Sequence, residues 1–192
     1  AAKEFPDVTF LGLDCSIPEG SPKNAVGVTF SEVQAGFLAG YAAVENGWTK
    51  LGFFSEKKDS QSILYGYGFV QGAQAYAKAK EMPAQSVEIR YAYADKPGNT
   101  PENQAVAKEW FQNGAEAIFT VGYELTNGVI AAAEEFGKQV IGADVNWSDA
   151  SQNVAISAMK HYSQAVQDLI DLSYNEELTG GSTVQRTAAE NG

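Results

Sequence analysis

The sequence from Val28 to Ala43 reads VTFSEVQAGFLAGYAA, and its pattern is that of a strand end followed by a helix. It opens with the end of an apolar run, Ala25–Phe30, that has the length and composition of a buried strand. Ser31 follows as a helix N-cap. Apolar side chains then recur at helical spacing, namely Phe37, Leu38, Tyr41, Ala42 and Val44. A strand followed directly by a helix is the repeating unit of parallel α/β sheets.

The same alternation continues along the chain, which predicts an α/β protein with a mainly parallel sheet and helices on both faces. Strands are predicted at Val8–Leu13, Lys50–Phe54, Ser86–Tyr93, Ala117–Val121, Val140–Ala143, Val154–Met159 and near Ser182–Arg186. Helices are predicted from about Ile63 to Lys80, from Pro101 to Asn113, around Ala131–Phe136, and after Met159 as far as about Tyr174. Three glycines inside the first of these helices, Gly66, Gly68 and Gly72, predict close packing of that helix on the sheet.

The uninterrupted series from Lys50 to Asp144 reads as one complete βα lobe, and its flanks read as parts of a second lobe. We therefore predict three segments. Residues 1–47 are the remainder of the first lobe, residues 48–147 are the complete lobe, and residues 148–192 are a return segment to the first lobe. The two crossings fall near Gly47–Lys50 and Trp147–Asn153.

Composition and motifs exclude several classes of partner and of functional site. The 192 residues are 44% hydrophobic and carry a net charge of −11, which argues against a nucleic acid polymer as partner but not against a neutral or cationic small ligand. With one cysteine, Cys15, and one histidine, His161, the chain offers no internal disulfide, no Cys/His metal site and no catalytic triad. It has no phosphate loop and no strand-anchored GxGxxG. These features favour a binding protein without a metal or cofactor over an enzyme.

Carboxylates follow two of the predicted strands. QVIGADVNW, from Gln139 to Trp147, begins as a buried strand and ends on an aspartate, an amide and a large aromatic residue. Asp14 follows the strand at Val8–Leu13 in the same way. Ligands of open parallel sheets bind at the carboxyl ends of the strands, so Asp144 is either a ligand acceptor or a cap of the next turn.

Several ordered motifs resemble those of the basic membrane protein (BMP) family. VTFSEVQAGFLAGYAA is similar to the family's strand, acidic residue and aromatic-Leu-Ala-Gly phrase. The resemblance continues through KLGFF, GFVQGAQ, WFQNGAEAIFTVGYELTNGV, VIGADVNW and ISAMKHYSQAV, and so covers nearly the whole chain. It implies a type I periplasmic-binding-protein-like fold, of which this chain holds one whole lobe and part of the other.

The resemblance also implies a function. Members of the family are solute-binding lipoproteins of ABC importers, and many bind purine nucleosides between two lobes. The expected partners are therefore a nucleoside-like small molecule and an ABC transporter permease, with no cofactor. The expected location is extracytoplasmic, on a membrane anchor outside these residues. Because most of the N-terminal lobe is expected to lie outside them too, uncovered apolar surface predicts self-association of this chain alone.

Site residues follow from the resemblance one by one. Asp144 matches the strand-end aspartate that accepts hydrogen bonds from ribose, and Lys160 matches the lysine of the returning segment. Gly122 matches a turn where backbone approaches the ligand, Asp14 matches an acidic strand end of the first lobe, and Tyr93 matches the aromatic that stacks on the base. The alternatives are a core aromatic for Tyr93 and a solvated surface lysine for Lys160. Trp147 either stacks on the ligand or packs against the hinge.

Departures from the family pattern lie at the rim of the expected cleft. The sequence has Asp144-Val145-Asn146-Trp147 where the family often has Asp-x-Asp-Gln, and Ser55-Glu56 where it has Gly-Gly. Tyr91-Ala92-Tyr93 replaces a Gly-Ser-Phe run. These changes leave two other hypotheses open. One is a receptor of the same fold for a flavin or another sugar-bearing compound, and the other is a fragment of an α/β hydrolase, which needs an activated nucleophile or a metal.

Overall fold

A computed structural model describes residues 1–175, 177–190 and 192 of the chain. It divides into two compact units, and each is described below by itself. Unit 1 comprises Ala1–Ser31 together with Lys160–Gly192, and unit 2 comprises Glu32–Met159.

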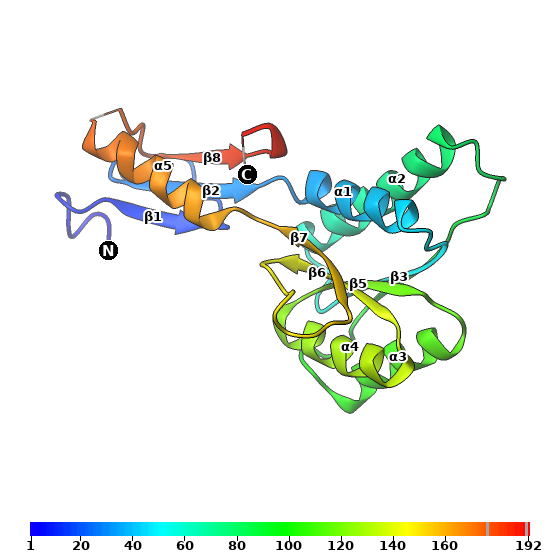
Figure 1. The fold of residues 1–192 in the computed structure, drawn as a ribbon. Coiled ribbons are helices and arrows are strands. Elements are labelled where there is room, and N and C mark those ends of the chain that lie inside the picture. The colour runs from blue at the N-terminus through cyan, green and yellow to red at the C-terminus, as the bar shows by residue number, and fades with distance from the viewer. Residues whose placement is uncertain (176, 191) are drawn as a thin grey trace. The chain divides into compact units, whose positions relative to one another are not determined.

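Unit 2 is a five-stranded parallel sheet with two helices on each face (Figure 1). Its strands are β3 (Lys50–Ser55), β4 (Glu88–Tyr93), β5 (Ala117–Val121), β6 (Gln139–Asp144) and β7 (Val154–Met159), in the spatial order β4-β3-β5-β6-β7. Its helices are α1 (Glu32–Glu45), α2 (Ser60–Ala79), α3 (Pro101–Gln112) and α4 (Tyr123–Phe136). The predicted α/β class and parallel sheet are confirmed.

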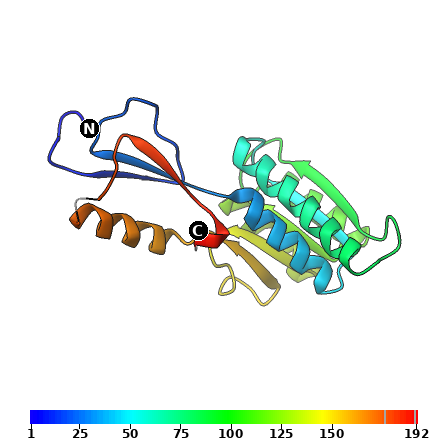
Figure 2. The same cartoon turned by 90° about the horizontal axis from the view of Figure 1, so that it is seen from above.

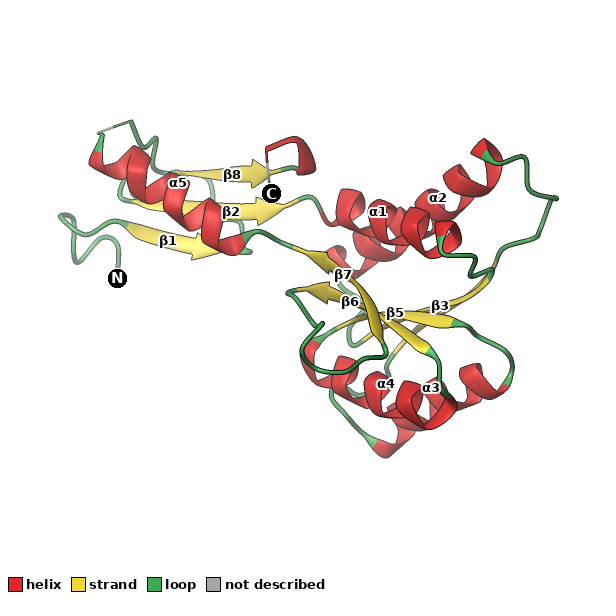
Figure 3. Cartoon of the chain, in the orientation of Figure 1, coloured by secondary structure: helices red, strands yellow, loops and turns green. Residues whose placement is uncertain are grey.

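Separate apolar cores fill the two faces of this sheet. Successive residues of a strand point to opposite faces. Accordingly, Phe53 belongs to the core shared with α1 and α2, and Phe54 belongs to the core shared with α3 and α4. Figure 3 shows the two helix pairs on opposite sides of the strands. Because all five strands are parallel, their carboxyl ends lie at the same edge of the sheet.

The backbones of α1 and α2 are in contact, because glycines face each other across the helix pair (Figure 2). A β-carbon at Gly40 would overlap the carbonyl oxygen of Phe69, and one at Gly72 would overlap that of Phe37. Gly36 and Gly68 make equivalent contacts with backbone atoms of the facing helix. A residue with any side chain would force the two helices apart.

This contact corrects two expectations. The helix after Ser31 is present and buries Val44, but most of its buried stripe consists of small residues such as Ala39 and Ala43, and Leu38 is 57% exposed. The glycines of α2 were expected to pack on the sheet. Only Gly66 does so, against Tyr91 of β4, whereas Gly68 and Gly72 pack on α1. Sequence periodicity marked the large apolar residues, while the closest approach is made by the smallest ones.

Unit 1 is a three-stranded parallel sheet with one long helix. The strands β1 (Phe10–Leu13), β2 (Ala25–Phe30) and β8 (Ser182–Arg186) lie in the order β1-β2-β8. The helix α5 (Tyr162–Tyr174) buries Ala165 and Leu169 against Val26, Val28 and Phe30, and a short 3₁₀ turn spans Ala188–Glu190. The strands predicted at Val8–Leu13 and Lys50–Phe54 thus lie in different sheets, as expected.

The division into units differs from the predicted boundaries at residues 47/48 and 147/148. The chain passes from unit 1 to unit 2 after Ser31 and returns after Met159. The first boundary moves because α1 packs on α2, and the second because β7 pairs with β6, from Val140 opposite Val154 to Asp144 opposite Met159. Each crossing therefore falls before a helix or after a strand of unit 2, one element away from the predicted position.

The glycine contact yields a stability prediction. Replacing Gly72 by alanine in the middle of a helix favours the helix by about 1 kcal/mol. Overlap with the Phe37 carbonyl oxygen opposes that gain, and we expect a net loss of about 1–3 kcal/mol in the free energy of unfolding, measured by urea titration. The control is Gln71→Ala on the exposed side of α2, expected within about 0.5 kcal/mol of wild type. A Gly72→Ala variant as stable as the control would contradict the packing argument.

Glu116 links the starts of β3 and β5. Its Oε2 accepts hydrogen bonds from the backbone N–H groups of Thr49, at 2.7 Å, and Lys50, at 2.9 Å. Burial acts to raise the pKa of this carboxyl, but the backbone hydrogen bonds from Lys50 and Thr49 outweigh it, so the pKa lies below its ordinary value. A carboxyl with a lowered folded-state pKa stabilises the fold above its unfolded pKa, about 4.3, and loses that contribution as pH falls through the lower folded value.

We therefore expect Glu116→Gln to lower the unfolding free energy at neutral pH and to reduce its decline in acid. Urea titrations of both proteins between about pH 3 and pH 7 measure the difference, which should shrink as the wild-type carboxyl is protonated. Glu45→Gln, at an exposed glutamate of α1, removes the same charge without these hydrogen bonds and serves as the control. A pH-independent difference would show that the charge of Glu116 contributes nothing.

Candidate functional site

A small polar pocket lies at the carboxyl ends of β3, β5 and β6 in unit 2. These strands are parallel and adjacent, so the residues that end them, Ser55, Val121 and Asp144, lie at the same edge of the sheet. The pocket has a volume of about 160 Å³. Its lining residues are Glu56, Lys57, Asp59, Gln61, Ser62, Tyr65, Val121, Gly122 and Asp144. We call it the strand-end pocket.

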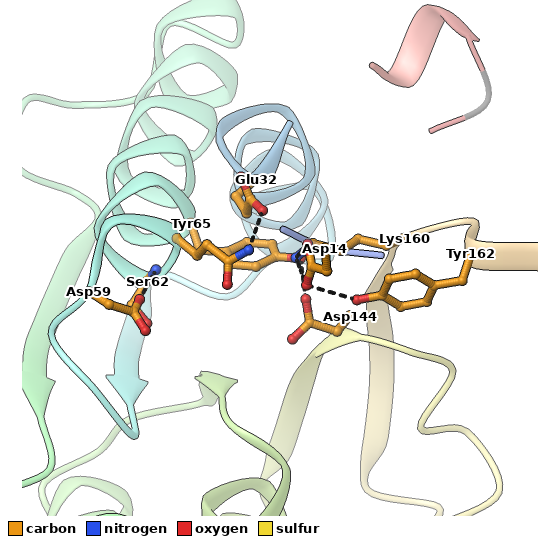
Figure 4. Close-up of polar contacts among 9 residues, drawn as sticks. Asp14, Glu32, Asp59, Ser62, Tyr65, Asp144, Lys160 and Tyr162 are labelled. Atoms are coloured by element: carbon orange, nitrogen blue, oxygen red, sulfur yellow. Dashed lines mark hydrogen bonds and ion pairs between the residues drawn. The ribbon is translucent and has the colours of Figure 1, made fainter. Parts of the chain in front are cut away.

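Asp144 is held in place by a tyrosine from α2. The hydroxyl of Tyr65 donates a hydrogen bond to Asp144 Oδ1 at 2.9 Å, and the Tyr65 side chain is 1% exposed (Figure 4). The backbone of Asp144 is left-handed, with φ of 70°. Non-glycine residues in this region are uncommon and cluster at functional sites. The structure thus places Asp144 at the strand-end pocket, and Tyr65 is a site residue that the sequence patterns did not mark.

Gly122 forms the wall of the same pocket at the start of α4. Its φ of 123° is unfavourable for a residue with a side chain. A β-carbon here would overlap the Cβ of Glu56 and lie 2.8 Å from its Oε2. The Gly122 carbonyl accepts from the backbone N–H and the hydroxyl of Thr126, at 2.9 and 2.7 Å. Gly122 therefore lines the strand-end pocket together with Asp144, and its missing side chain makes room for Glu56.

The N-terminus of α2 supplies the rest of the lining. Asp59 caps the helix, because its Oδ1 accepts from the Ser62 N–H at 2.9 Å. Gln61 donates to Oε1 of Glu32 at 3.3 Å, and Glu32 is 4% exposed. Polar side chains on this helix end are thus fixed by hydrogen bonds inside unit 2 and present a charged, preorganised surface.

A second polar group lies in unit 1. Lys160 Nζ is 2.9 Å from both carboxylate oxygens of Asp14, and its side chain is 2% exposed (Figure 4). The Tyr162 hydroxyl donates to Asp14 Oδ2 at 3.1 Å. The ammonium also lies 5.9 Å from the centre of the Phe30 ring. Lys160 is therefore a buried member of an ion pair with Asp14, which excludes the alternative of a solvated surface lysine.

Two further predicted site residues, like Asp14 and Lys160, do not line the strand-end pocket. Trp147 is 6% exposed, its Nε1 donates to the Ala143 carbonyl at 2.9 Å, and it packs in the core shared with α3 and α4. Tyr93 ends the outer strand β4 and lines a different cavity of about 260 Å³, together with Asp95, Lys96 and the start of α3.

Tyr93 belongs to an aromatic group on β4. Its hydroxyl is 2.9 Å from that of Tyr91, and its ring meets Phe53 edge-on at 6.5 Å. Burial, reinforced by the hydrogen bond to Tyr93, raises the pKa of Tyr91 well above its ordinary value. Tyr91 is therefore a neutral hydrogen-bonding group at physiological pH. Tyr93 is half-buried, and the Lys58 ammonium lies 5.8 Å from the centre of its ring.

Within the described residues, no three His, Cys, Asp or Glu side chains are arranged to hold a metal ion. Over the same part of the chain, no helix is both long and apolar enough to cross a membrane. Cys15 is an exposed free thiol.

The chain has the fold of type I periplasmic binding proteins. A solved structure of an ABC transporter system solute-binding protein from Aeropyrum pernix K1 matches it with a TM-score of 0.77 at 21% identity. The match covers 98% of this chain and 54% of that one. At this identity the likeness shows the fold alone.

The sequence gives the family. The model described as "ABC transporter substrate-binding protein PnrA-like" matches residues 1–192, so the chain belongs to this Bmp family. Basic membrane protein B of Borrelia garinii subsp. bavariensis is 32% identical over 171 residues, which are 85% of this chain and 48% of the relative. An ABC transporter nucleoside-binding protein, BmpA, of Lactococcus lactis subsp. cremoris is 22% identical over 203 residues, 96% of this chain and 55% of the relative. The chain thus spans about half the length of these relatives.

The ion pair in unit 1 yields a prediction for stability. Asp14→Asn removes a charge that lies 2.9 Å from a buried ammonium, and Lys160→Met removes the ammonium itself. We expect each change to lower the unfolding free energy, and the double variant to lose about 1–3 kcal/mol less than the sum of the two. Urea titration of all four proteins measures this coupling. Strictly additive losses would contradict a direct interaction.

Proposed function

We propose that this chain is the ligand-binding part of an extracytoplasmic solute-binding protein of an ABC importer, and that its ligand is a purine nucleoside. The observation that carries the proposal is Asp144, a strand-end carboxylate held by Tyr65 beside Gly122 in a preorganised pocket. Membership of the substrate-binding family supports the transport role, and the name of the Lactococcus lactis relative supports a nucleoside.

The chemistry of the strand-end pocket favours the sugar end of such a ligand. A volume of about 160 Å³ is below the range of about 300–1,000 Å³ that encloses a whole drug-sized ligand, so it suits one ring of a larger molecule. Most of its lining side chains are charged or polar. Ionised carboxylates are acceptors only, which matches the hydroxyl donors of ribose.

Lys160 and Tyr93 are also proposed as ligand residues, each for its own chemistry. The Lys160 ammonium, held by Asp14, is a buried donor of the kind that complements sugar oxygens. Tyr93 remains our proposal for the residue that stacks on the base, because an aromatic face is the surface that a purine binds best. Trp147 is left out of this assignment, since its indole is buried in the core.

The remaining parts of the proposal concern the whole protein. The partner is the permease of an ABC importer, and the protein is carried on the outer face of the membrane by a lipid anchor. The proposed role involves binding and release without catalysis. Native mass spectrometry of the intact protein purified from cells tests it by identifying retained ligand, and incubation with inosine followed by product analysis tests for turnover. Conversion of inosine would contradict a pure binding role.

The contribution of Asp144 to ligand binding can be tested by substitution. In the intact protein, Asp144→Ala removes a charged acceptor, so we expect nucleoside binding to weaken by about 1.5–3 kcal/mol, while binding of the free base changes little. Isothermal titration calorimetry with inosine and hypoxanthine measures both. The matched control is Asp149→Ala, an exposed aspartate in the loop after β6, which should behave like wild type. Equal losses for nucleoside and base would place Asp144 away from the ribose.

A further inference from the structure

Glu56 lines the strand-end pocket, and none of the roles assigned above involves its carboxylate. It directly follows β3, is half-buried and lines the pocket with Asp144 and Gly122. The side chain folds against Gly122, where its Oε2 lies 2.8 Å from the position that a β-carbon would take. The left-handed glycine therefore gives the Glu56 carboxylate its place in the wall.

The carboxylate of Glu56 differs from the other two acids of the pocket. Asp59 accepts the Ser62 N–H that caps α2, and Asp144 accepts the Tyr65 hydroxyl. The backbone N–H of Glu56 donates to the Val121 carbonyl at 2.8 Å, which fixes the main chain. Its carboxylate, in contrast, makes no hydrogen bond or ion pair with any residue that the structure describes. It is an acceptor group held in the wall and available to a ligand.

The lining of the strand-end pocket also carries a net negative charge. Three carboxylates, Glu56, Asp59 and Asp144, and one ammonium, Lys57, are among its lining groups, so the acids outnumber the base. A phosphate group carries about −1.5 to −2 charges at neutral pH. Placing it beside the half-buried carboxylates of Glu56 and Asp144 costs both repulsion and the loss of its water, whereas a hydroxyl group brings only a donor that a carboxylate accepts.

We propose that Glu56 is a specificity-determining residue: it accepts a hydrogen bond from a sugar hydroxyl of the ligand and excludes ligands phosphorylated on the sugar. This inference rests on the proposed function and narrows it, because it separates nucleosides from nucleotides. The attractive and the repulsive effect come from the same charge. Removing the charge while keeping the shape therefore changes both.

The test is calorimetry of the intact protein with inosine, inosine 5′-monophosphate and inosine 3′-monophosphate. Wild type is expected to bind inosine at least about 100-fold more tightly than either phosphate. Glu56→Gln should weaken inosine binding about fivefold, because a neutral acceptor replaces a charged one, and should reduce the preference over at least one phosphate about tenfold. Glu56→Asp keeps the charge and should keep the exclusion of phosphate.

Two controls make the outcome decisive. Glu124→Gln removes a charge from the exposed first turn of α4, close in sequence to Gly122 but outside the pocket lining, and should leave every affinity within about twofold of wild type. Glu56→Gln with unchanged inosine affinity and unchanged preference would overturn the role of Glu56 and leave the proposed function intact. Failure of wild type to bind inosine, guanosine and adenosine would overturn the proposed function, and this inference with it.

Discussion

The backbone contact between α1 and α2 is the constraint on which the site in unit 2 depends. Gly36 of α1 lies against the backbone of Tyr65, so a β-carbon there would overlap the Tyr65 carbonyl oxygen. Tyr65 is 1% exposed, and its side-chain hydroxyl donates a hydrogen bond to Asp144. Because the glycines fix the distance between the helices, they also fix where the Tyr65 hydroxyl ends relative to β6. Gly36, in the stretch from Val28 to Ala43, therefore helps to position the Tyr65 hydroxyl at Asp144.

Each unit contains a strand-end aspartate that is held by a tyrosine hydroxyl. Asp14 follows β1 with φ of 57° and Asp144 ends β6 with φ of 70°, both in the left-handed region. Each carboxylate accepts a tyrosine hydroxyl from its own unit, at 3.1 Å from Tyr162 and at 2.9 Å from Tyr65. Such backbone conformations cost about 1–3 kcal/mol unless the surroundings hold them. Two independent instances of a strained strand-end aspartate fixed by a tyrosine indicate that the position of the carboxylate matters more than the local strain.

The sequence predicted the elements well because hydrophobic runs, caps and terminal glycines are local signals. Pro101 after the cap Thr100 and the left-handed Gly137 after α4 are both as expected. Prediction was poorer for features that depend on tertiary contacts. The buried face of α1 depends on a partner helix, and the unit boundary on the pairing of β7 with β6. Tyr65 sits in an apolar helical stretch, where a buried tyrosine looks like any core aromatic, so no local pattern marks its hydroxyl as part of the site.

The run Asp144-Val145-Asn146-Trp147 shows how one turn serves both the core and the site. After Asp144 the chain reverses, with the Val145 N–H donating to the Ala143 carbonyl at 2.8 Å. Trp147 then returns to the strand: its Cγ would lie 2.7 Å from a β-carbon at Gly142, and its Nε1 bonds the Ala143 carbonyl. The Trp147 indole therefore packs in the core and stabilises the turn, while the Asp144 carboxylate lines the strand-end pocket. An aspartate alone would leave this left-handed turn free to relax, and the buried tryptophan supplies the packing that holds it.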